Sequence, residues 1–232
     1  MIVSPAVAEI GARRSPDLAE VARLILERTN DSRRGEGRGP TGPDAKLSAV
    51  ARDFASFMAR TDRYGHEADG KTPAQRAQEH GYGYCLVLEN IGSLHSSEGF
   101  GTEELADRVM QGWKQSPGHR KNLLDPEVTD IGVAIAQSEK SRTYYAVQLF
   151  GRPLSKQIEF RVANASPVAV DYELNGKTFS LPPRATRIHQ ECRATRLTVR
   201  LPGERQSTTV QPADGDRYDV VRLGSRYQLK KG

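Results

Sequence analysis

The most informative stretch of the chain, residues 102–124, reads TEELADRVMQGWKQSPGHRKNLL. Its threonine and the two glutamates that follow favour a helix start, because acidic side chains in a first turn face the positive end of the helix dipole. Apolar residues recur at helical spacing as far as Trp113, so one face of this helix is expected to pack inward. Pro117 is expected to end the helix, with Ser116 and His119 in the turn around it.

Upstream of this stretch the sequence predicts three more helices. Apolar residues recur at helical spacing from Leu18 onward and again over residues 47–58. Residues 72–75, Thr-Pro-Ala-Gln, combine an N-cap, a proline at the first helical position and a capping-box glutamine. The helix that begins there should end at Gly81, a natural left-handed terminator. Residues 31–45 are rich in glycine and proline and predict a loop.

Downstream of residue 124 the hydrophobic period changes from helical to alternating. Residues 131–135 and 145–149 alternate and predict two strands. Beyond residue 157 only short alternating runs remain, and Asn175-Gly176 between two of them is a strong signal for a two-residue hairpin. A series of short strands with turn signals is typical of a small β-sandwich or barrel.

Charge and pattern together divide the chain into three expected segments: an N-terminal extension (1–16), an α+β domain (17–153) and a basic all-β module (154–232). The last segment has 14 Lys and Arg against 8 Asp and Glu, a net charge of +6, whereas the rest has 20 against 21. This excess fits attraction to an anionic cell-wall polymer or to lipid headgroups. We expect no nucleic-acid partner, because an aromatic content of 6% offers no base-stacking platform.

Six arginines of the basic module lie within a short stretch of the sequence. Arginine pairs bidentately with phosphate and carboxylate, so these residues are candidates for attachment to an anionic surface. The alternative is a solvated strand face on which they balance nearby acids. The six are Arg184, Arg187, Arg193, Arg196, Arg200 and Arg205.

Length and composition limit the class of protein further. A chain of 232 residues with 37% hydrophobic residues can form a packed core, and it has no uncharged apolar run near the ~18 residues of a membrane span. Residues 1–14 lack a signal peptide, although Ala6-Val7-Ala8 has the small-x-small form of a cleavage site. Cys85 and Cys192 lie in different predicted domains, which leaves one bridge or two free thiols open.

Three side chains of the first domain can bind a metal ion or carry a proton: His66, Glu89 and His119. Each lies beside turn-forming residues at the end of a predicted helix, where side chains are expected to project into a cleft. The other histidines lack such neighbours and are expected to be solvated surface groups: His80, His95 and His189.

An ordered set of residues around these three resembles the CAP superfamily (also called SCP, or cysteine-rich secretory, antigen 5 and pathogenesis-related proteins) in its compact bacterial form. The matched residues are Asn30, Arg33, His66, Asp69, Gly70, Pro73, Arg76, Gly81, Tyr82, Glu89, Asn90, Ile91, Trp113, Ser116, Pro117, Gly118, His119, Arg120, Asn122, Gly132, Val133, Gln148, Leu149, Phe150 and Gly151. The resemblance covers about residues 17–153. It implies a three-layer α-β-α sandwich with a central antiparallel sheet, in a secreted or cell-envelope protein.

The resemblance also implies a cavity with two histidines and two acids, of which His66, Glu89 and His119 match three. The fourth, an acid on the tryptophan-bearing helix, has no match, because Trp113 is followed by Lys-Gln-Ser at 114–116. Two neutral imidazoles and one carboxylate would suit Zn²⁺ or another divalent cation, although no cofactor is required. The missing carboxylate should weaken the binding of hard cations such as Mg²⁺.

Five neighbours are expected to support the cleft: Asn90, Trp113, Ser116, Arg120 and Asn122. Purely structural roles are the alternative for the site. Glu89 would then hold a turn at residues 88–92 through backbone N–H groups, and the two histidines would only hydrogen-bond across a polar cleft. Arg120 and Asn122 are expected to fix their loop through backbone carbonyls, and Trp113 to belong to the core.

The leading hypothesis is a monomeric, non-enzymatic binding module with a His/Glu cleft for a divalent metal or a small polar ligand, attached to a surface by its basic domain. The rival is a metal-assisted hydrolase of a peptide or cell-wall bond, in which Glu89 and His66 or His119 activate water. A serine nucleophile fits poorly, because the chain has no Gly-x-Ser-x-Gly elbow and Ser116 precedes a proline. A purely structural cleft is the third hypothesis.

Overall fold

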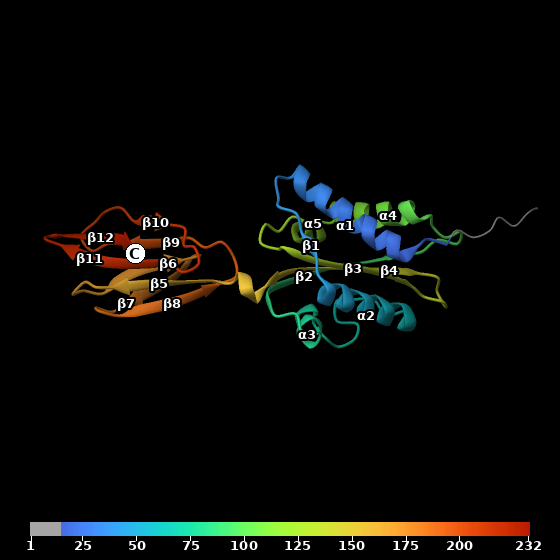
Figure 1. Cartoon of the computed structure of the whole chain (residues 1–232), viewed down its shortest axis with the longest axis horizontal. Coiled ribbons are helices and arrows are strands. Elements are labelled where there is room, and N and C mark those ends of the chain that lie inside the picture. The colour runs from blue at the N-terminus through green and yellow to red at the C-terminus, as the bar shows by residue number, and fades with distance from the viewer. Residues whose placement is uncertain (1–14) are drawn as a thin grey trace, which may run out of the picture. The chain divides into compact units, whose positions relative to one another are not determined.

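The computed structural model describes residues 15–232. Most of the predicted N-terminal extension, including Ala6-Val7-Ala8, therefore lies outside the described residues. The chain divides into two compact units, one that ends at Gly151 and one that begins at Arg152 (Figure 1).

The first unit is built around the four-stranded sheet β1-β3-β4-β2. Its strands are β1 (Gly42–Pro43), β2 (Tyr84–Leu94), β3 (Asp130–Gln137) and β4 (Tyr144–Pro153). β3 and β4 are antiparallel over their length, whereas the two-residue β1 at the edge runs parallel to β3. Both strands predicted from alternation, β3 and β4, are confirmed.

Helices cover both faces of this sheet, as expected for an α-β-α sandwich (Figure 1). They are α1 (Leu18–Gly35), α4 (Thr102–Gln115) and α5 (Pro117–Leu123) on one face, and α2 (Ala45–Thr61) and α3 (Pro73–Glu79) on the other. The alternation of β4 explains the two layers. Tyr144 and Phe150 join the core beneath α1 and α4, while Tyr145 and Leu149 join the core beneath α2.

Two segments that were expected to be non-helical are partly helical in the structure. The loop expected at 31–45 begins later, because α1 continues to Gly35. Arg33, only 1% exposed, stabilises this extension by donating to the carbonyls of Gly39, Leu123 and Asp125. Pro117 ends α4 as expected, but it also begins α5, since proline fits the first turn of a helix.

The second unit is a β-sandwich rather than a barrel. Its two four-stranded sheets have the orders β10-β9-β6-β7 and β12-β11-β5-β8. The strands are β5 (Ile158–Asn164), β6 (Val170–Leu174), β7 (Lys177–Leu181), β8 (Thr186–Glu191), β9 (Leu197–Arg200), β10 (Thr208–Val210), β11 (Arg217–Leu223) and β12 (Arg226–Lys231), preceded by the 3₁₀ turn η1 (Leu154–Lys156). Inward side chains of both sheets, such as Phe160 and Val199, form one shared core.

The hairpin expected at Asn175-Gly176 is confirmed. Leu174 pairs with Lys177 across a two-residue turn, and both turn residues have positive φ angles of 49° and 82°. This is the conformation that the Asn-Gly signal favours.

His189 does not lie on the surface, contrary to expectation. It is 7% exposed, its Nε2 lies 2.7 Å from the Tyr172 hydroxyl, and its ring stacks on Phe160. His80 is half-buried against Asp53, while His95 is exposed as expected.

Neither Cys85 nor Cys192 is a free thiol. Among residues 15–232, no helix is both long and apolar enough to pass through a bilayer.

Candidate functional site

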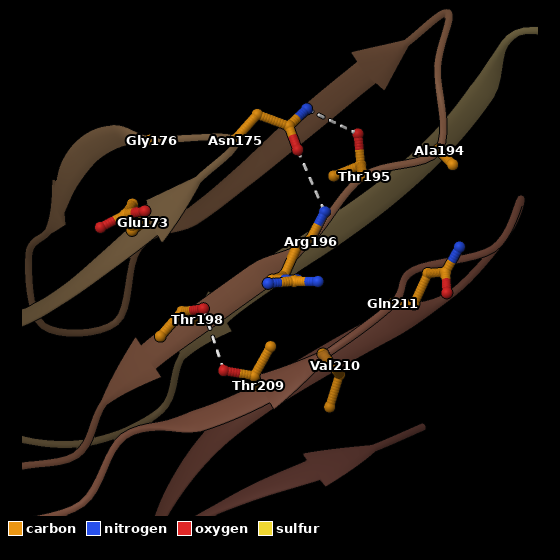
Figure 2. Close-up of a pocket in the computed structure, with 10 residues that line it drawn as sticks. All are labelled: Glu173, Asn175, Gly176, Ala194, Thr195, Arg196, Thr198, Thr209, Val210 and Gln211. Atoms are coloured by element: carbon orange, nitrogen blue, oxygen red, sulfur yellow. Dashed lines mark hydrogen bonds between the residues drawn. The ribbon is translucent and has the colours of Figure 1, made fainter.

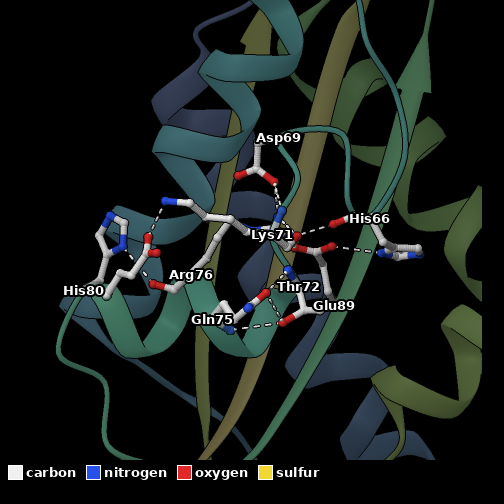
Figure 3. A network of polar contacts seen from close by, with 9 residues as sticks. His66, Asp69, Lys71, Thr72, Gln75, Arg76, His80 and Glu89 are labelled. Carbon is white, nitrogen blue, oxygen red and sulfur yellow. Dashed lines mark hydrogen bonds and ion pairs between the residues drawn. The ribbon is translucent and has the colours of Figure 1, made fainter.

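Glu89 lies within β2, so the prediction that it lies at the end of a helix is wrong. The alternative in which it holds a turn at 88–92 is wrong as well. Its side chain is only 1% exposed, and a buried carboxylate requires partners. Oε1 lies 2.8 Å from Nδ1 of His66, and Oε2 accepts a 2.8 Å bond from Nη2 of Arg76 (Figure 3). Both carboxylate oxygens are therefore engaged within the protein.

Arg76 on α3 holds the site together. Its side chain is 4% exposed and donates to the Asp69 carboxylate at 2.8 Å and to the carbonyls of Lys71 and His66 at 2.7 and 2.9 Å. Its guanidinium also lies 3.5 Å from the ring centre of Phe54. One arginine thus fixes the segment that carries His66 against the carboxylate of β2. Arg76 is not among the site residues expected from the sequence, although it lies one turn beyond Thr72, the N-cap of α3.

His66 contacts the protein through one of its two ring nitrogens. Nδ1 faces Glu89, and the side chain is 51% exposed. The hydrogen bond to Glu89 raises the pKa of His66 above its usual 6.5. Below that pKa Nε2 is a hydrogen-bond donor, whereas above it a proton kept on Nδ1 leaves Nε2 as a lone-pair acceptor.

His119 lies within α5 and is partly buried. Burial lowers its pKa below 6.5, and the positive charge of His66 lowers it further. This electrostatic effect is consistent with His66 and His119 lying in the same part of the first unit. The pKa values of the two histidines are therefore shifted in opposite directions.

A network of side-chain amides links the backbone at Glu89 to the backbone at His119. Asn90 is fully buried and donates to the carbonyl of His119 at 3.2 Å and to Gln148 at 3.0 Å. Asn122 donates to the carbonyl of Glu89 at 3.1 Å and to the side-chain oxygen of Asn90 at 3.0 Å. These bonds connect β2 to α5, so the positions of Glu89 and His119 depend on each other.

Three other residues were expected to support the cleft: Trp113, Ser116 and Arg120. Trp113 is 2% exposed and donates to the carbonyl of Ile91, as a core residue would. Arg120 does not bind backbone carbonyls as expected; it is exposed and pairs with Glu36 at 2.5 Å. Ser116 precedes α5 without a side-chain capping bond.

Tyr64 is a residue of this region that the sequence analysis missed. It is 51% exposed, and burial together with the negative charge of Glu89 raises its pKa. Its ring centre lies 6.4 Å from that of Tyr145. The sequence signal that could have indicated Tyr64 is its position two residues before His66, next to a glycine.

The expected set of three metal ligands is not found. Among residues 15–232, no three His, Cys, Asp or Glu side chains are grouped so that they could hold a metal ion. The physical reason lies at Glu89, where the Arg76 guanidinium occupies one carboxylate oxygen and His66 the other. A resident metal with three protein ligands therefore does not fit these residues.

The six candidate arginines do not share one face of the second unit. Arg187 lies on β8 and Arg200 on β9, which belong to different sheets. The Arg187 guanidinium lies 5.2 Å from the Phe179 ring centre, and Arg200 stands opposite Asp171 in the strand register. The other four lie between strands: Arg184, Arg193, Arg196 and Arg205.

Comparison with known protein families matches residues 26–150 to CAP, described as the cysteine-rich secretory protein family. Two similar proteins are uncharacterised: YkwD of Bacillus subtilis (strain 168), 32% identical over 117 residues, and a Borreliella burgdorferi protein, 28% identical over 89 residues. The alignments cover 50% and 38% of this chain. The chain spans about half the length of these relatives, 42% and 52%.

Solved structures include similar folds. An outer surface protein of Borrelia burgdorferi matches with a TM-score of 0.51 at 22% identity, over 58% of this chain and 93% of that one. An extracellular protein from Bacillus anthracis that contains an SCP domain matches with a TM-score of 0.49 at 26% identity, over 58% and 41%. The first of these likenesses supports the α-β-α fold.

Proposed function

The chain belongs to the cysteine-rich secretory protein (CAP) family, and on that premise we propose that it is a secreted or envelope-attached binding module. The relatives described as an outer surface protein and as an extracellular protein support this location.

The His66 and His119 pair is the binding site in this proposal, and its ligand is a small polar molecule with an acceptor oxygen, such as a carboxylate. The contact between His66 Nδ1 and the buried Glu89 carries the proposal, because it fixes the ring and leaves Nε2 for a ligand. Glu89 acts through His66 and does not touch the ligand. The charged form of His66, favoured by its raised pKa, donates from Nε2.

Acetate and Zn²⁺ are the probes that test this site, in titration calorimetry of the wild type and of His66→Ala and His119→Ala. We expect acetate to bind more tightly at about pH 6 than at about pH 8, because the charged fraction of His66 decreases as the pH rises, and each variant to weaken it about tenfold. His95→Ala is the matched control, because His95 is an exposed histidine elsewhere on the same unit.

Two results would contradict this proposal. Equal acetate affinities in the wild type and both site variants would remove the site. Zn²⁺ bound tightly by the wild type and lost in both variants would identify the pair as a metal site instead, since affinity would then rise with pH as the imidazoles lose their protons.

Hydrolysis at the same site is a second candidate function, favoured by one observation. A histidine held at 2.8 Å by a buried carboxylate has the geometry of a general base with its orienting group. Turnover of peptidoglycan or casein by the wild type that disappears in Glu89→Gln would support it. No turnover across a broad panel of such substrates would leave the binding role.

The second unit is the attachment module in this proposal, since residues 154–232 carry the net charge of +6. Retention of the full chain on vesicles rich in phosphatidylglycerol, or on an anionic polysaccharide, that decreases with added salt is the expected result. Equal retention of the chain on neutral and anionic matrices would contradict the attachment role.

A further inference from the structure

A polar pocket of about 670 Å³ lies on the second unit, on the outer face of the sheet β10-β9-β6-β7. Polar side chains dominate its lining: Glu173, Asn175, Arg196, Thr198, Thr209 and Gln211 (Figure 2). This pocket has no residue in common with the histidine site.

The strand register sets the floor of this pocket. Thr198 on β9 stands between Glu173 on β6 and Thr209 on β10. Adjacent strands lie about 4.8 Å apart, so a carboxylate and two hydroxyls follow one another in a row across the sheet. Arg196, two residues before Thr198, lines the same pocket about 6.8 Å further along the strand direction. A ligand that contacts both this row of side chains and Arg196 must present polar groups on two sides.

Hydrogen bonds hold the walls in place before any ligand arrives. Asn175, in the left-handed conformation, donates from Nδ2 to Oγ1 of the buried Thr195 at 3.0 Å and accepts from the backbone N–H of Arg196 at 3.1 Å. On the floor, the hydroxyls of Thr198 and Thr209 are 3.0 Å apart. A site that is already ordered loses less entropy on binding.

The hydrogen bonds within the lining of this pocket do not use its two charged groups. The hydrogen bonds drawn in Figure 2 use Asn175, Thr195, the backbone of Arg196 and the two floor threonines. The guanidinium of Arg196 and the carboxylate of Glu173 take no part in them. A guanidinium suits a carboxylate on the ligand, and a carboxylate accepts bonds from neighbouring hydroxyls.

We propose that this pocket binds an acidic saccharide, with the sugar carboxylate on Arg196 and sugar hydroxyls on Glu173, Thr198 and Thr209. Hydroxyl and amide groups outnumber charged groups in the lining, which favours a ligand rich in hydroxyls. A zwitterionic peptide would satisfy the two charges and leave the hydroxyl groups unmatched. A nucleobase would lack a stacking partner, since no aromatic residue lines the pocket. The inference rests on the attachment role proposed for the second unit and names its ligand class.

Trigalacturonate and its neutral methyl ester are the probes that test this proposal, in titration calorimetry with the full chain. We expect Arg196→Gln to weaken trigalacturonate binding about tenfold or more, because a charge-assisted bidentate contact is lost. Thr198→Val, which keeps the shape and removes one hydroxyl, should weaken it by about two- to fivefold. Arg226→Gln is the control with the same charge change, since Arg226 is exposed on β12 of the other sheet and should leave the affinity unchanged.

Three results would overturn the proposal: no heat with trigalacturonate, equal weakening by Arg196→Gln and Arg226→Gln, or tighter binding of Ala-Ala dipeptide than of the saccharide. Circular dichroism melts of each variant verify that the second unit remains folded. Failure here is distinguishable from failure of the attachment role, because retention on phosphatidylglycerol vesicles through diffuse charge does not need the pocket.

Discussion

At the scale of single residues, the site depends on the buried carboxylate of Glu89. Glu89 is stable in β2 because Arg76 and His66 pair with its two oxygens, and Arg76 is itself buried against the Phe54 ring. Removing one partner of such a pair leaves an uncompensated buried charge, which is strongly unfavourable. The geometry presented to a ligand and the stability of the first unit therefore depend on the same contacts.

Arg76→Met is accordingly expected to destabilise the first unit by about 3–5 kcal/mol, since it leaves Glu89 with only His66 as a partner. Denaturant unfolding followed by tryptophan fluorescence measures this, because the single Trp113 lies in the first unit. Arg23→Met is the control: Arg23 pairs with Glu20 and Glu27 on the exposed face of α1, where solvent screens the contact. Equal losses of unfolding free energy in the two variants would show that the buried pair stabilises the unit no more than the exposed one.

The sequence could indicate His66, Glu89 and His119 as a group, but not how they are paired. That grouping came from an ordered set of motifs, and the electrostatic effect of His66 on His119 is consistent with it. Arg76 could not be recognised as the clamp from the sequence, because only the packing of α3 beside β2 brings its guanidinium to Glu89. The same pairing explains why three metal ligands do not assemble.

At the scale of elements, α2 and β3 approach so closely that a glycine is required between them. A Cβ atom at Gly132 would lie 2.2 Å from the backbone carbon of Leu47 and 2.4 Å from the backbone nitrogen of Ser48. Neither backbone atom can move without shifting α2 away from the sheet. This contact fixes the distance between α2 and the sheet.

Gly132→Ala is therefore expected to cost at least about 1–3 kcal/mol of unfolding free energy, as overpacking does in other cores. Gly112→Ala on the exposed face of α4 is the matched control, since a Cβ there meets nothing within 4 Å. It should stabilise the helix by about 0.5–1 kcal/mol. The two variants should shift the thermal midpoint in opposite directions, and shifts of the same sign would refute the close-packing argument.

Strong local signals predicted most elements, and the failures lie where tertiary contacts override them. The capping box at Thr72 and the turn at Asn175-Gly176 behave as their local chemistry dictates. β2 was missed because its centre, Glu89-Asn90, is polar and buried, a combination that local patterns assign to a turn. Only partners far along the chain, such as Gln148, satisfy these groups within a strand.

At the scale of the whole molecule, pH acts in opposite ways on two histidines, one in each unit. In the first unit, the hydrogen bond to Glu89 raises the pKa of His66. In the second, burial and then the charge of Arg187 lower the pKa of His189. A raised pKa contributes stability that is present below 6.5 and lost as the pH rises through the folded-state value. A lowered pKa has the reverse effect, because the unfolded state then takes up the proton more readily.

The second unit is thus expected to lose stability as the pH falls below about 6.5, and His189→Gln should reduce this loss. Unfolding of wild type and variant at about pH 7.5 and pH 5, followed by tyrosine fluorescence and circular dichroism, measures the difference. His95→Gln is the control, because that side chain is exposed. An acid dependence that is identical in wild type and His189→Gln would contradict the assignment to His189.

The resemblance to the CAP superfamily implied the α-β-α architecture, and the alternating pattern predicted a second, all-β part. It could not decide between a sandwich and a barrel, because alternating runs specify strands but not which strands pair. Nor could it reveal the polar pocket, which depends on the register of Glu173, Thr198 and Thr209 across three strands.

The pairing of His66 with Glu89 is tested most directly by following the imidazole resonances of the five histidines in an NMR pH titration of the wild type and of Glu89→Gln. We predict that His66 titrates above 6.5 and His119 below it in the wild type, and that the midpoint of His66 falls in Glu89→Gln. A His66 midpoint at or below 6.5 in the wild type, unchanged by Glu89→Gln, would contradict the account.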